Sequence, residues 1–572
     1  MRILIILAAL ICASCGGGGG SSPGPTSQPT AQPTAQPTAE PTAEPTVVPT
    51  SIPTSTPTSE PGDITVSGTV TFDKVPHGVN GKLNFAATTA MPVRGASVTL
   101  LDGDDAILRQ ARTDDSGAYS IGAPANTPVR VLVRAELVRD DTASWHFRVV
   151  DNTSSGALYV LADDLITTGS SDESRDLHAP SGWNAVVSEY SDEQQRPAAP
   201  FAILDSIHQA LDGLLAVDPT IQLSQCNLNW SPDNRAIYGE ISSGDIGTTY
   251  YLTGTGNIYV LGKADNDTDE FDFSVIQHEF GHFLEDAISR SDSVGGNHGL
   301  NASVDMRVAF SEGMSNAFTG IVSGQEFYFD SFGDDQDNGF GFSLENNSLT
   351  GEGWYNENSV GKVIYDLADT TNEAGDNLSL GLAGLYNVIT HASFIESDAM
   401  ASIFLFREVF DSLMDSGDQS ALDALLTAES IVGSDRFGTG ESNSGGSAHA
   451  LPVYHNLTVG GSAVQVCSDN SIAPYNGLGV SQFVRFSLSG QDLVNIRIEM
   501  TSTVGVTTTD PDARLYLNGS LLERYDSSFS DVETHLANLQ AGNYVLEVYE
   551  HSNTLSAEEN AGGLACFDVT VN

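Results

Sequence analysis

Two histidines and a glutamate near the middle of the chain have the spacing of a metal site. Residues 275–284 run VIQHEFGHFL, which places His278, Glu279 and His282 in an HExxH arrangement. Residues four apart on an α-helix lie about 40° apart around its axis, so both imidazoles can reach one metal ion. Glu279 is offset by one position, where a carboxylate can accept a proton from metal-bound water. The pattern predicts a zinc site with Glu279 as general base.

The alternative is an ordinary helix that carries two solvated histidines. The neighbouring residues argue against it, because they make the helix largely apolar: Val275, Ile276, Phe280, Phe283 and Leu284. The polar triplet is therefore set into a buried face, and buried His and Glu side chains need partners. These flanks favour the metal site.

A third protein ligand is needed beyond the two histidines. Glu285 and Ile288 stand where the HExxHxxGxxH pattern has its glycine and third histidine, so that pattern is excluded. Glu312 is the preferred candidate, because it lies in an apolar segment predicted to form a helix over 304–322. His298, in the Gly-rich loop before that helix, is the rival ligand.

The order of these motifs resembles a known family. HEFGH followed by SEGMSNAF at 311–318 resembles the gluzincin metallopeptidases, most of all the fungalysin and thermolysin branch, in which a helix bearing EGxSD follows HExxH. The resemblance implies a thermolysin-like domain, Zn²⁺ as cofactor and Glu312 as third ligand. Asn316 stands where relatives carry an aspartate that orients a zinc-bound histidine. Its carbonyl can accept the imidazole N–H, but with less charge, so we expect a less basic ligand.

Peptide hydrolysis also needs a hydrogen-bond donor for the oxyanion. Residues 353–366 resemble a helix that follows the ligand helix in fungalysin-like enzymes. Tyr355 and Tyr365 in this segment, and His391 after it, are candidates, with Tyr355 and His391 preferred. Each is also a residue type that commonly packs in a core with its polar tip bonded.

Two acidic stretches are candidate calcium sites. Residues 265–270, DNDTDE, open like an EF-hand loop, but glycine is missing at the sixth place and Ile276 occupies the twelfth, so the segment is not an EF-hand. Its acids, or Asp334, Asp335 and Asp337, are expected either to bind calcium from loops or to form solvated turns.

Hydrophobic periodicity divides the rest of the chain into three folded parts. Residues 63–169 alternate apolar and polar side chains between turns, which predicts an antiparallel β-sandwich. Residues 170–455 have strand-like runs first and helical spacing afterwards, which predicts an α+β domain. Residues 456–572 alternate again and predict a second sandwich. The expected fold is therefore multidomain, with an α+β metallopeptidase domain flanked by two all-β sandwiches.

Both flanking parts resemble accessory domains of peptidases. GASVTL at 95–100 with TDDSGAY at 113–119 resembles the carboxypeptidase regulatory-like sandwich, and DPDARLYL at 510–517 with LQAGNY at 539–544 resembles the pre-peptidase C-terminal domain. The first resemblance implies a scaffold or adhesive role, and the second implies targeting or substrate contact.

The start of the chain has the features of an export signal. Arg2, an apolar run over 3–11 and the small residues before Cys15 make a segment too short to span a bilayer. Its Ala-Ser-Cys ending resembles a bacterial lipoprotein signal (1–15), which implies lipidation of Cys15; an ordinary cleaved signal peptide is the alternative. Residues 16–62 form a Pro/Thr-rich linker whose regular prolines predict an extended stalk. We therefore expect an exported protein, lipid-anchored at the bacterial outer membrane or cell surface.

Export also implies an oxidising compartment, where cysteines pair. Cys467 and Cys566 stand near the two ends of the C-terminal part and are expected to form a disulfide. Cys226 is then a buried, unpaired thiol.

Charge limits the partners. Acidic residues outnumber basic ones 75 to 23, for a net charge of −52, and the sequence has no Lys/Arg cluster. Nucleic acid and anionic lipid surfaces are therefore not expected partners. The preferred function is a zinc endopeptidase that acts on protein or peptide substrates and touches the membrane only through its lipid. Two alternatives stay open: a non-catalytic surface adhesion module that retains the fold, and a metal-dependent hydrolase of another bond, such as an ester.

Overall fold

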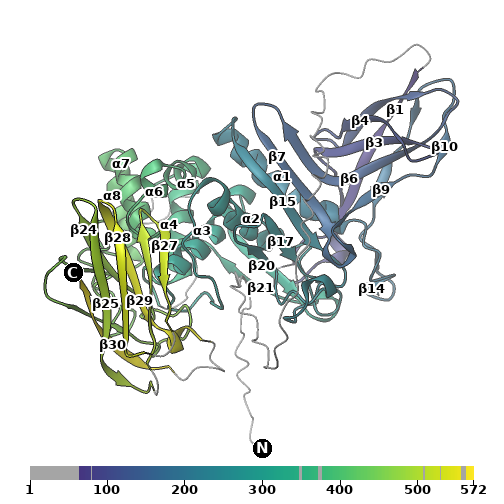
Figure 1. Ribbon diagram of the computed structural model, residues 1–572. Coiled ribbons are helices and arrows are strands. Elements are labelled where there is room, and N and C mark those ends of the chain that lie inside the picture. The colour runs from purple at the N-terminus through teal and green to yellow at the C-terminus, as the bar shows by residue number, and fades with distance from the viewer. Residues whose placement is uncertain are drawn as a thin grey trace, which may run out of the picture.

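The computed structural model describes residues 63–78, 80–346, 351–370, 377–506, 509–527, 530–555 and 562–572, and only the backbone of Asp335. The expected signal at 1–15, Cys15 and the linker at 16–62 lie outside these residues. The described chain is multidomain and combines several β-sheets with eight α-helices. Strands β1–β10 gather at one end and the C-terminal strands at the other, with α2 and α3 between them (Figure 1). No helix in the described part of the chain is both long and apolar enough to cross a membrane.

The N-terminal strands alternate buried and partly exposed residues, as half-buried strands do. β1 (Asp63–Lys74) is the centre of a five-stranded sheet, and β6 (Pro128–Asp140) buries Val129, Val131 and Val133 in the next sheet. The partners of β1 are β2 (Thr89–Pro92), β5 (Ala118–Pro124), β11 (Glu173–Ser174) and β12 (Leu177–Ala179). β6 pairs with β3 (Ala96–Asp102), β7 (Ser144–Asp151), β9 (Val160–Ala162) and β10 (Ile166–Thr167). β4 (Ile107–Arg112) pairs with β3, and β8 (Ala157–Leu158) pairs with β7.

One sheet crosses the boundary expected between residues 169 and 170. β7 pairs in parallel with β15 (Gln222–Trp230), β15 pairs in parallel with β17 (Asn257–Val260), and β16 (Tyr250–Leu252) forms the far edge. The N-terminal strands and the α+β part therefore share one ten-stranded sheet. α1 (Ala199–Val217) lies between β7 and β15 in the chain and packs on this sheet. Alternation and turns reveal each strand, but not which edge of a sheet it joins.

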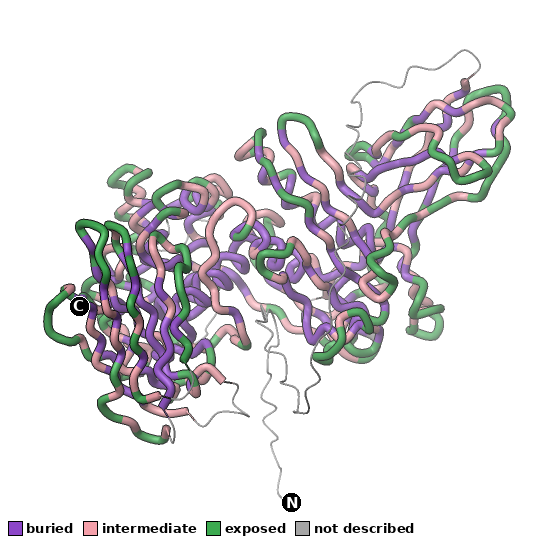
Figure 2. Tube along the Cα trace, in the orientation of Figure 1, coloured by how far each residue is buried: buried purple, intermediate pink, exposed green. Residues whose placement is uncertain are grey.

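Two central helices carry the site. α2 (Phe273–Ile288) buries its apolar residues, and Phe280 and Phe283 pack edge-on against Phe147 of β7. α3 (Met306–Ser323) begins where the Asp305 carboxylate accepts the backbone N–H of Arg307, and it ends at Gly324 in a left-handed conformation. The buried stretches of both helices lie in the interior of the molecule (Figure 2).

Glycines let the helices approach closely. A Cβ at Gly281 of α2 would lie 2.8 Å from the Ser315 hydroxyl of α3. A Cβ at Gly313 of α3 would lie 2.6 Å from the Glu357 carbonyl of α4 (Glu357–Ala368). These contacts bring the side chains of α2, α3 and α4 within reach of one another. The helices that follow are α5 (Gly381–Ile389), α6 (Ala392–Ile395), α7 (Ile403–Leu413) and α8 (Ser416–Ala428).

A small antiparallel sheet lies beside the start of α2. Its order is β18 (Gly262–Lys263), β19 (Asp267–Thr268), β20 (Phe327–Phe332) and β21 (Asn338–Ser343). β20 packs on both α2 and α3. This sheet therefore joins the segment before α2 to the segment after α3.

The C-terminal part is a β-sandwich with its own core. One sheet has the order β22 (Tyr454–Asn456), β24 (Gln482–Leu488), β29 (Gly542–Glu550), β26 (Pro511–Leu517) and β27 (Ser520–Tyr525). The other has the order β23 (Val464–Ser468), β30 (Leu564–Val571), β25 (Asp492–Val504) and β28 (Val532–Leu539). The Cys467–Cys566 disulfide joins β23 to β30, and Cys226 is a buried free thiol in β15.

Candidate metal centre

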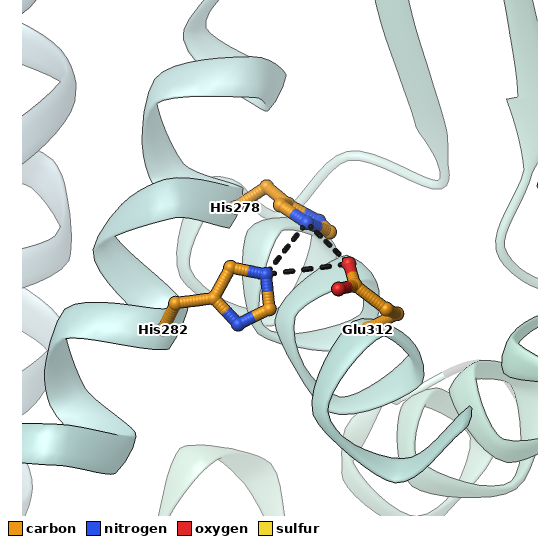
Figure 3. Close-up of side chains that lie close together, drawn as sticks. All are labelled: His278, His282 and Glu312. Atoms are coloured by element: carbon orange, nitrogen blue, oxygen red, sulfur yellow. Dashed lines mark hydrogen bonds and ion pairs between the residues drawn. The ribbon is translucent and has the colours of Figure 1, made fainter. Parts of the chain in front are cut away.

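The HExxH histidines of α2 and Glu312 of α3 point their donor atoms at one another (Figure 3). Nε2 of His278 lies 3.1 Å from Nε2 of His282 and 3.1 Å from Oε2 of Glu312, and Nε2 of His282 lies 3.3 Å from the same Oε2. The exposed fractions of the three side chains are only 3%, 12% and 4% in the order His278, His282 and Glu312. The three residues therefore form one compact, nearly equilateral donor set.

This triangle fits a zinc ion. Tetrahedral zinc with bonds of about 2.0–2.2 Å needs donor atoms about 3.3 Å apart, close to the 3.1–3.3 Å found here. Two imidazole nitrogens and one carboxylate oxygen are also a common donor set for catalytic zinc. The residues present thus meet both the spacing and the chemistry that zinc requires.

Neighbouring side chains orient both imidazoles. Nδ1–H of His278 donates to Oδ1 of Asn316 at 2.9 Å, which leaves Nε2 free to face the centre. Nδ1 of His282 lies 3.1 Å from the Ser311 hydroxyl and 3.2 Å from the Ser315 hydroxyl. Ser311 donates in turn to Glu285, whose carboxylate lies 3.5 Å from Nδ1 of His282. Asn316 is thus where the family resemblance implies it.

Sequence reasoning missed Glu285, Ser311 and Ser315 as orienting groups. Glu285 lies three residues after His282 on the same helix, and the two serines lie one before and three after Glu312. Helical spacing places Glu285 on the face of His282 and Ser315 on the face of Glu312, whereas Ser311 is adjacent to Glu312 and shares a face with Ser315. That spacing was the available signal.

The charges of the centre are balanced. Burial alone would raise the pKa of Glu312, but His298 and His282 and hydrogen bonds from His278 and His282 hold that pKa well below its usual range. Burial alone would lower the pKa of His282, but Glu312 and Glu285 raise it well above its usual value. Without metal the histidine and the carboxylate stabilise each other's charged forms. A metal at this centre would have to displace protons, which would make its binding depend on pH.

His298, the rival ligand, also lies at this centre. Its Nε2 lies 3.4 Å from Oε2 of Glu312, its Nδ1 lies 2.5 Å from Oε2 of Glu357, and its side chain is 2% exposed. His298 does not belong to the compact donor group of His278, His282 and Glu312. Its Gly-rich loop is more fixed than its composition predicts, because the Asn476 side chain donates to the carbonyls of Gly295 and Asn297 at 2.9 Å and 3.1 Å.

Glu279 stands beside the donor triangle. The residue is fully buried, and its Oε2 accepts the backbone N–H of Tyr251 at 2.7 Å. Glu279, His282 and Glu312 line a cavity of about 400 Å³ together with Tyr250–Thr253, the loop 291–295 and Arg524. The cavity thus lies between the ligand helices, the edge strand β16 and strand β27 of the C-terminal sandwich.

Neither preferred oxyanion donor lines this cavity. The Tyr355 hydroxyl donates to Oδ1 of Asn443 at 2.9 Å and to the Glu352 carbonyl at 3.0 Å, and the Tyr355 ring packs against Trp354. His391 precedes α6, where its Nδ1 accepts the backbone N–H of Ser393 at 3.2 Å. Tyr365, the third candidate, packs against Gly320 of α3. The structure therefore does not bring these three residues to the donor triangle.

A second group of side chains with metal-ligand chemistry lies outside this cavity. One carboxylate oxygen from each of Asp267, Asp269 and Asp330 lies within 4.8 Å of the others. Asp267 and Asp269 belong to the acidic stretch noted in the sequence, whereas Asp330 comes from β20. Asp334 and Asp337 do not join the group, and the side chain of Asp335 lies outside the described residues.

Comparison with known proteins leaves the family open. No family model matches the chain, and no curated protein matches it. Among solved structures, the pre-peptidase C-terminal domain of a Bacillus anthracis collagenase is 11% identical over 21% of this chain and 94% of its own, with a TM-score of 0.15. The secreted serine protease VesC from Vibrio cholerae is 20% identical over 21% of this chain and 23% of its own, with a TM-score of 0.13. Such scores are too low to indicate a shared fold.

Proposed function

We propose that this chain is a zinc-dependent metalloendopeptidase of the gluzincin type, with His278, His282 and Glu312 as the zinc ligands. The observation that carries the proposal is the donor triangle, whose edges of 3.1–3.3 Å suit tetrahedral zinc. The neighbouring Glu279 supports it, because this buried carboxylate lines the same cavity as two of the proposed ligands. The family resemblance of HEFGH and SEGMSNAF points to the same chemistry.

Glu279 is the proposed general base. When bound, zinc would polarise the scissile carbonyl and lower the pKa of the attacking water. Glu279 takes a proton from that water and returns it to the leaving amine. The backbone N–H of Tyr251 donates to one carboxylate oxygen of Glu279 at 2.7 Å, which fixes the side chain in the cavity.

The cavity walls suit an extended peptide. β16 is an edge strand of the ten-stranded sheet, and it lines the cavity together with Thr253. Backbone groups on an edge strand can pair with a peptide that adds as a further strand. In β16 the N–H of Tyr251 already bonds Glu279, so the pairing would use the other backbone groups of this edge. Arg524 from the C-terminal sandwich also lines the cavity and supplies a positive charge for a substrate carboxylate.

Cleavage of a quenched-fluorescence peptide library by the full-length protein tests the proposal. The wild type should cut, whereas Glu279→Gln should lose cleavage by at least about 100-fold, in line with the typical contribution of a general base. Glu279→Gln should keep one zinc per chain, measured by elemental analysis. Glu193→Gln is a matched control, because Glu193 pairs with Lys263 at the surface, and it should cut like the wild type.

Two results would redirect the proposal. A wild type that holds one zinc but cuts no peptide would favour the adhesion module. A wild type that cleaves ester substrates and leaves peptides intact would favour the other hydrolase. Cleavage by Glu279→Gln at the wild-type rate would refute the assignment of the base.

We further propose that the protein is exported and lipid-anchored through Cys15, at the bacterial outer membrane or cell surface. The support is the sequence of residues 1–15 and the Pro/Thr-rich linker that follows. Metabolic labelling with palmitate should mark the wild type and not Cys15→Ser, which should appear in the soluble fraction. Labelling of Cys15→Ser to the wild-type level would overturn the lipid assignment.

A further inference from the structure

Three aspartates meet on one face of the small sheet beside α2. Asp267 of β19 pairs with Phe332 of β20 in antiparallel register, so Asp269 comes level with Asp330 two residues further along. Side chains alternate along a strand, and these positions therefore share a face. One oxygen from each of Asp267, Asp269 and Asp330 lies within 4.8 Å of the others.

Within the described part of the chain, the charged groups that act on these aspartates are other carboxylates. Burial first, and then repulsion by neighbouring carboxylates, raise the pKa of all three, to about 8 for Asp267. The nearby Asp272, by contrast, is paired with His77 at 2.7 Å and accepts from Ser331. Like charges held together in a buried place are costly unless a cation joins them.

Buried oxygen atoms without partners point to the same place. Asp269 is 3% exposed, and among the described residues its Oδ1 has no hydrogen-bond partner, nor has Oδ1 of Asp267. Gln336 is 1% exposed and lies between the two strands, where its Nε2 is 3.4 Å from the Ser331 hydroxyl and 3.5 Å from the Thr268 carbonyl. Its Oε1 also has no partner. A buried polar atom that stays unsatisfied destabilises the folded state.

We propose that Asp267, Asp269 and Asp330 form a calcium site. Calcium binds oxygen ligands at about 2.3–2.6 Å, so two ligands of one ion lie at most about 5 Å apart, as these carboxylates do. The ion supplies the missing positive charge and gives the partnerless aspartate oxygens a ligand role. Three carboxylates suit calcium better than magnesium, which usually keeps several waters and uses one or two carboxylates.

Calcium at the aspartate group stiffens the two chain segments that lead to the histidine centre. Oδ2 of Asp269 accepts the Thr249 hydroxyl, and two residues later the backbone N–H of Tyr251 holds Glu279. On the other side, residues 269–272 lead directly into α2, which carries His278. Calcium here acts as a structural ion. Its binding can therefore be measured whether or not the zinc centre is active.

Calorimetric titration of the metal-free, full-length protein with CaCl₂ tests the site. The expected result is one calcium per chain with a dissociation constant between about 10⁻⁷ and 10⁻³ M, accompanied by a higher melting temperature. Asp330→Asn should weaken calcium binding at least tenfold. Asp334→Asn is the matched control: it changes an exposed acid on the loop that follows β20 and should bind calcium like the wild type.

Further variants distinguish loss of this calcium site from loss of the zinc centre and from misfolding. Glu312→Gln should retain the calcium isotherm, whereas a loss of calcium binding there would assign the ion to the histidine centre and overturn the proposal. Should circular dichroism show that Asp330→Asn is unfolded, Asp267→Asn takes its place, with weaker calcium binding expected. Absence of calcium binding by the folded wild type, or equal affinity for MgCl₂, would also overturn it.

Discussion

Glu312 is a buried carboxylate, and the group of Asp267, Asp269 and Asp330 is partly buried, with Asp269 the most enclosed. The charges around the two sites are opposite. Three histidine rings lie within 3.4 Å of one oxygen of Glu312, and the pKa of Glu312 is held well below its usual range. Around the aspartates the neighbouring charges are carboxylates, and their pKa values are raised. Burial opposes ionisation in both places.

The difference shows what each site needs from a metal. The histidine centre balances its charges internally, so a metal there replaces protons and competes with them. The aspartate group has no internal balance, and its raised pKa values mean that it also holds protons. A cation there displaces those protons and, in addition, supplies the counter-charge that the group lacks. A metal is therefore expected to matter for chemistry at the first site and for stability at the second.

The largest expected effect comes from removing the charge of Glu312. Glu312→Gln should abolish peptide cleavage and weaken zinc binding by more than about 100-fold, since even the partners of zinc ligands typically contribute 10–100-fold. Zinc content after dialysis against a chelator measures this. Asp330→Asn is the control and should keep one zinc per chain. Full zinc occupancy in Glu312→Gln would remove this residue from the ligand set.

A third buried carboxylate tests whether counter-charge decides the direction of the pKa shift. Glu547 of the C-terminal sandwich is fully buried and lies 2.7 Å from Nη2 of Arg307 on α3. Burial would raise the pKa of Glu547, but Arg307 and Arg514 lower it to about 2. Because this folded-state pKa lies below the unfolded value, the stabilisation is present above pH ~4.5 and is lost as the pH falls towards about 2.

Glu547→Gln should therefore lower the free energy of unfolding by about 3 kcal/mol at pH 7, and the difference should shrink between pH 4.5 and 2. Urea unfolding at pH 7, 5 and 3 measures the change. Glu499→Gln removes an exposed pair with Arg497 and should cost less than about 1 kcal/mol. A loss for Glu547→Gln that stays constant with pH would contradict the role of its charge.

The sequence was informative where the chemistry is local. HExxH spacing and apolar flanks identify a helix that presents two imidazoles, and the SEGMSNAF resemblance selects Glu312 for the same cluster. The structure brings these side chains together. Tyr251, whose backbone N–H holds Glu279, and Glu357, which holds His298, carry no such signal, because tertiary packing alone joins them to the site.

The aspartate group and the shared sheet illustrate the same limit. The acidic loop of Asp267 and Asp269 is visible in the sequence, but Asp330 joins it through the pairing of β19 with β20. Alternation likewise predicts strands on both sides of residue 169, whereas the parallel pairing of β7 with β15 that unites them is long-range. Register between distant strands depends on three-dimensional packing and not on local propensity.

At the aspartate group we expect a smaller change in the free energy of unfolding, with a pH dependence opposite to that of Glu547. Because the folded-state pKa values are raised, metal-free protein should lose stability as the pH rises from about 4 to about 8, the pKa of Asp267. Asp269→Asn removes one negative charge and should stabilise the metal-free protein at pH 8 by about 1–3 kcal/mol, with no gain at pH 4. Melting temperatures at both pH values, with and without CaCl₂, check this. Lower stability of metal-free Asp269→Asn at pH 8 would contradict the repulsion.

The smallest expected effect concerns Asn316, whose Oδ1 accepts Nδ1–H of His278 at 2.9 Å. Asn316→Asp puts a full negative charge on that acceptor, which raises the basicity of the imidazole and should tighten zinc binding by up to about tenfold. Competition with a fluorescent zinc chelator measures the change, and Asn538→Asp, at an exposed position on β28, should leave it unaltered. Weaker zinc binding in Asn316→Asp would mean that the centre, already supplied with the carboxylates of Glu312 and Glu285, tolerates no further negative charge.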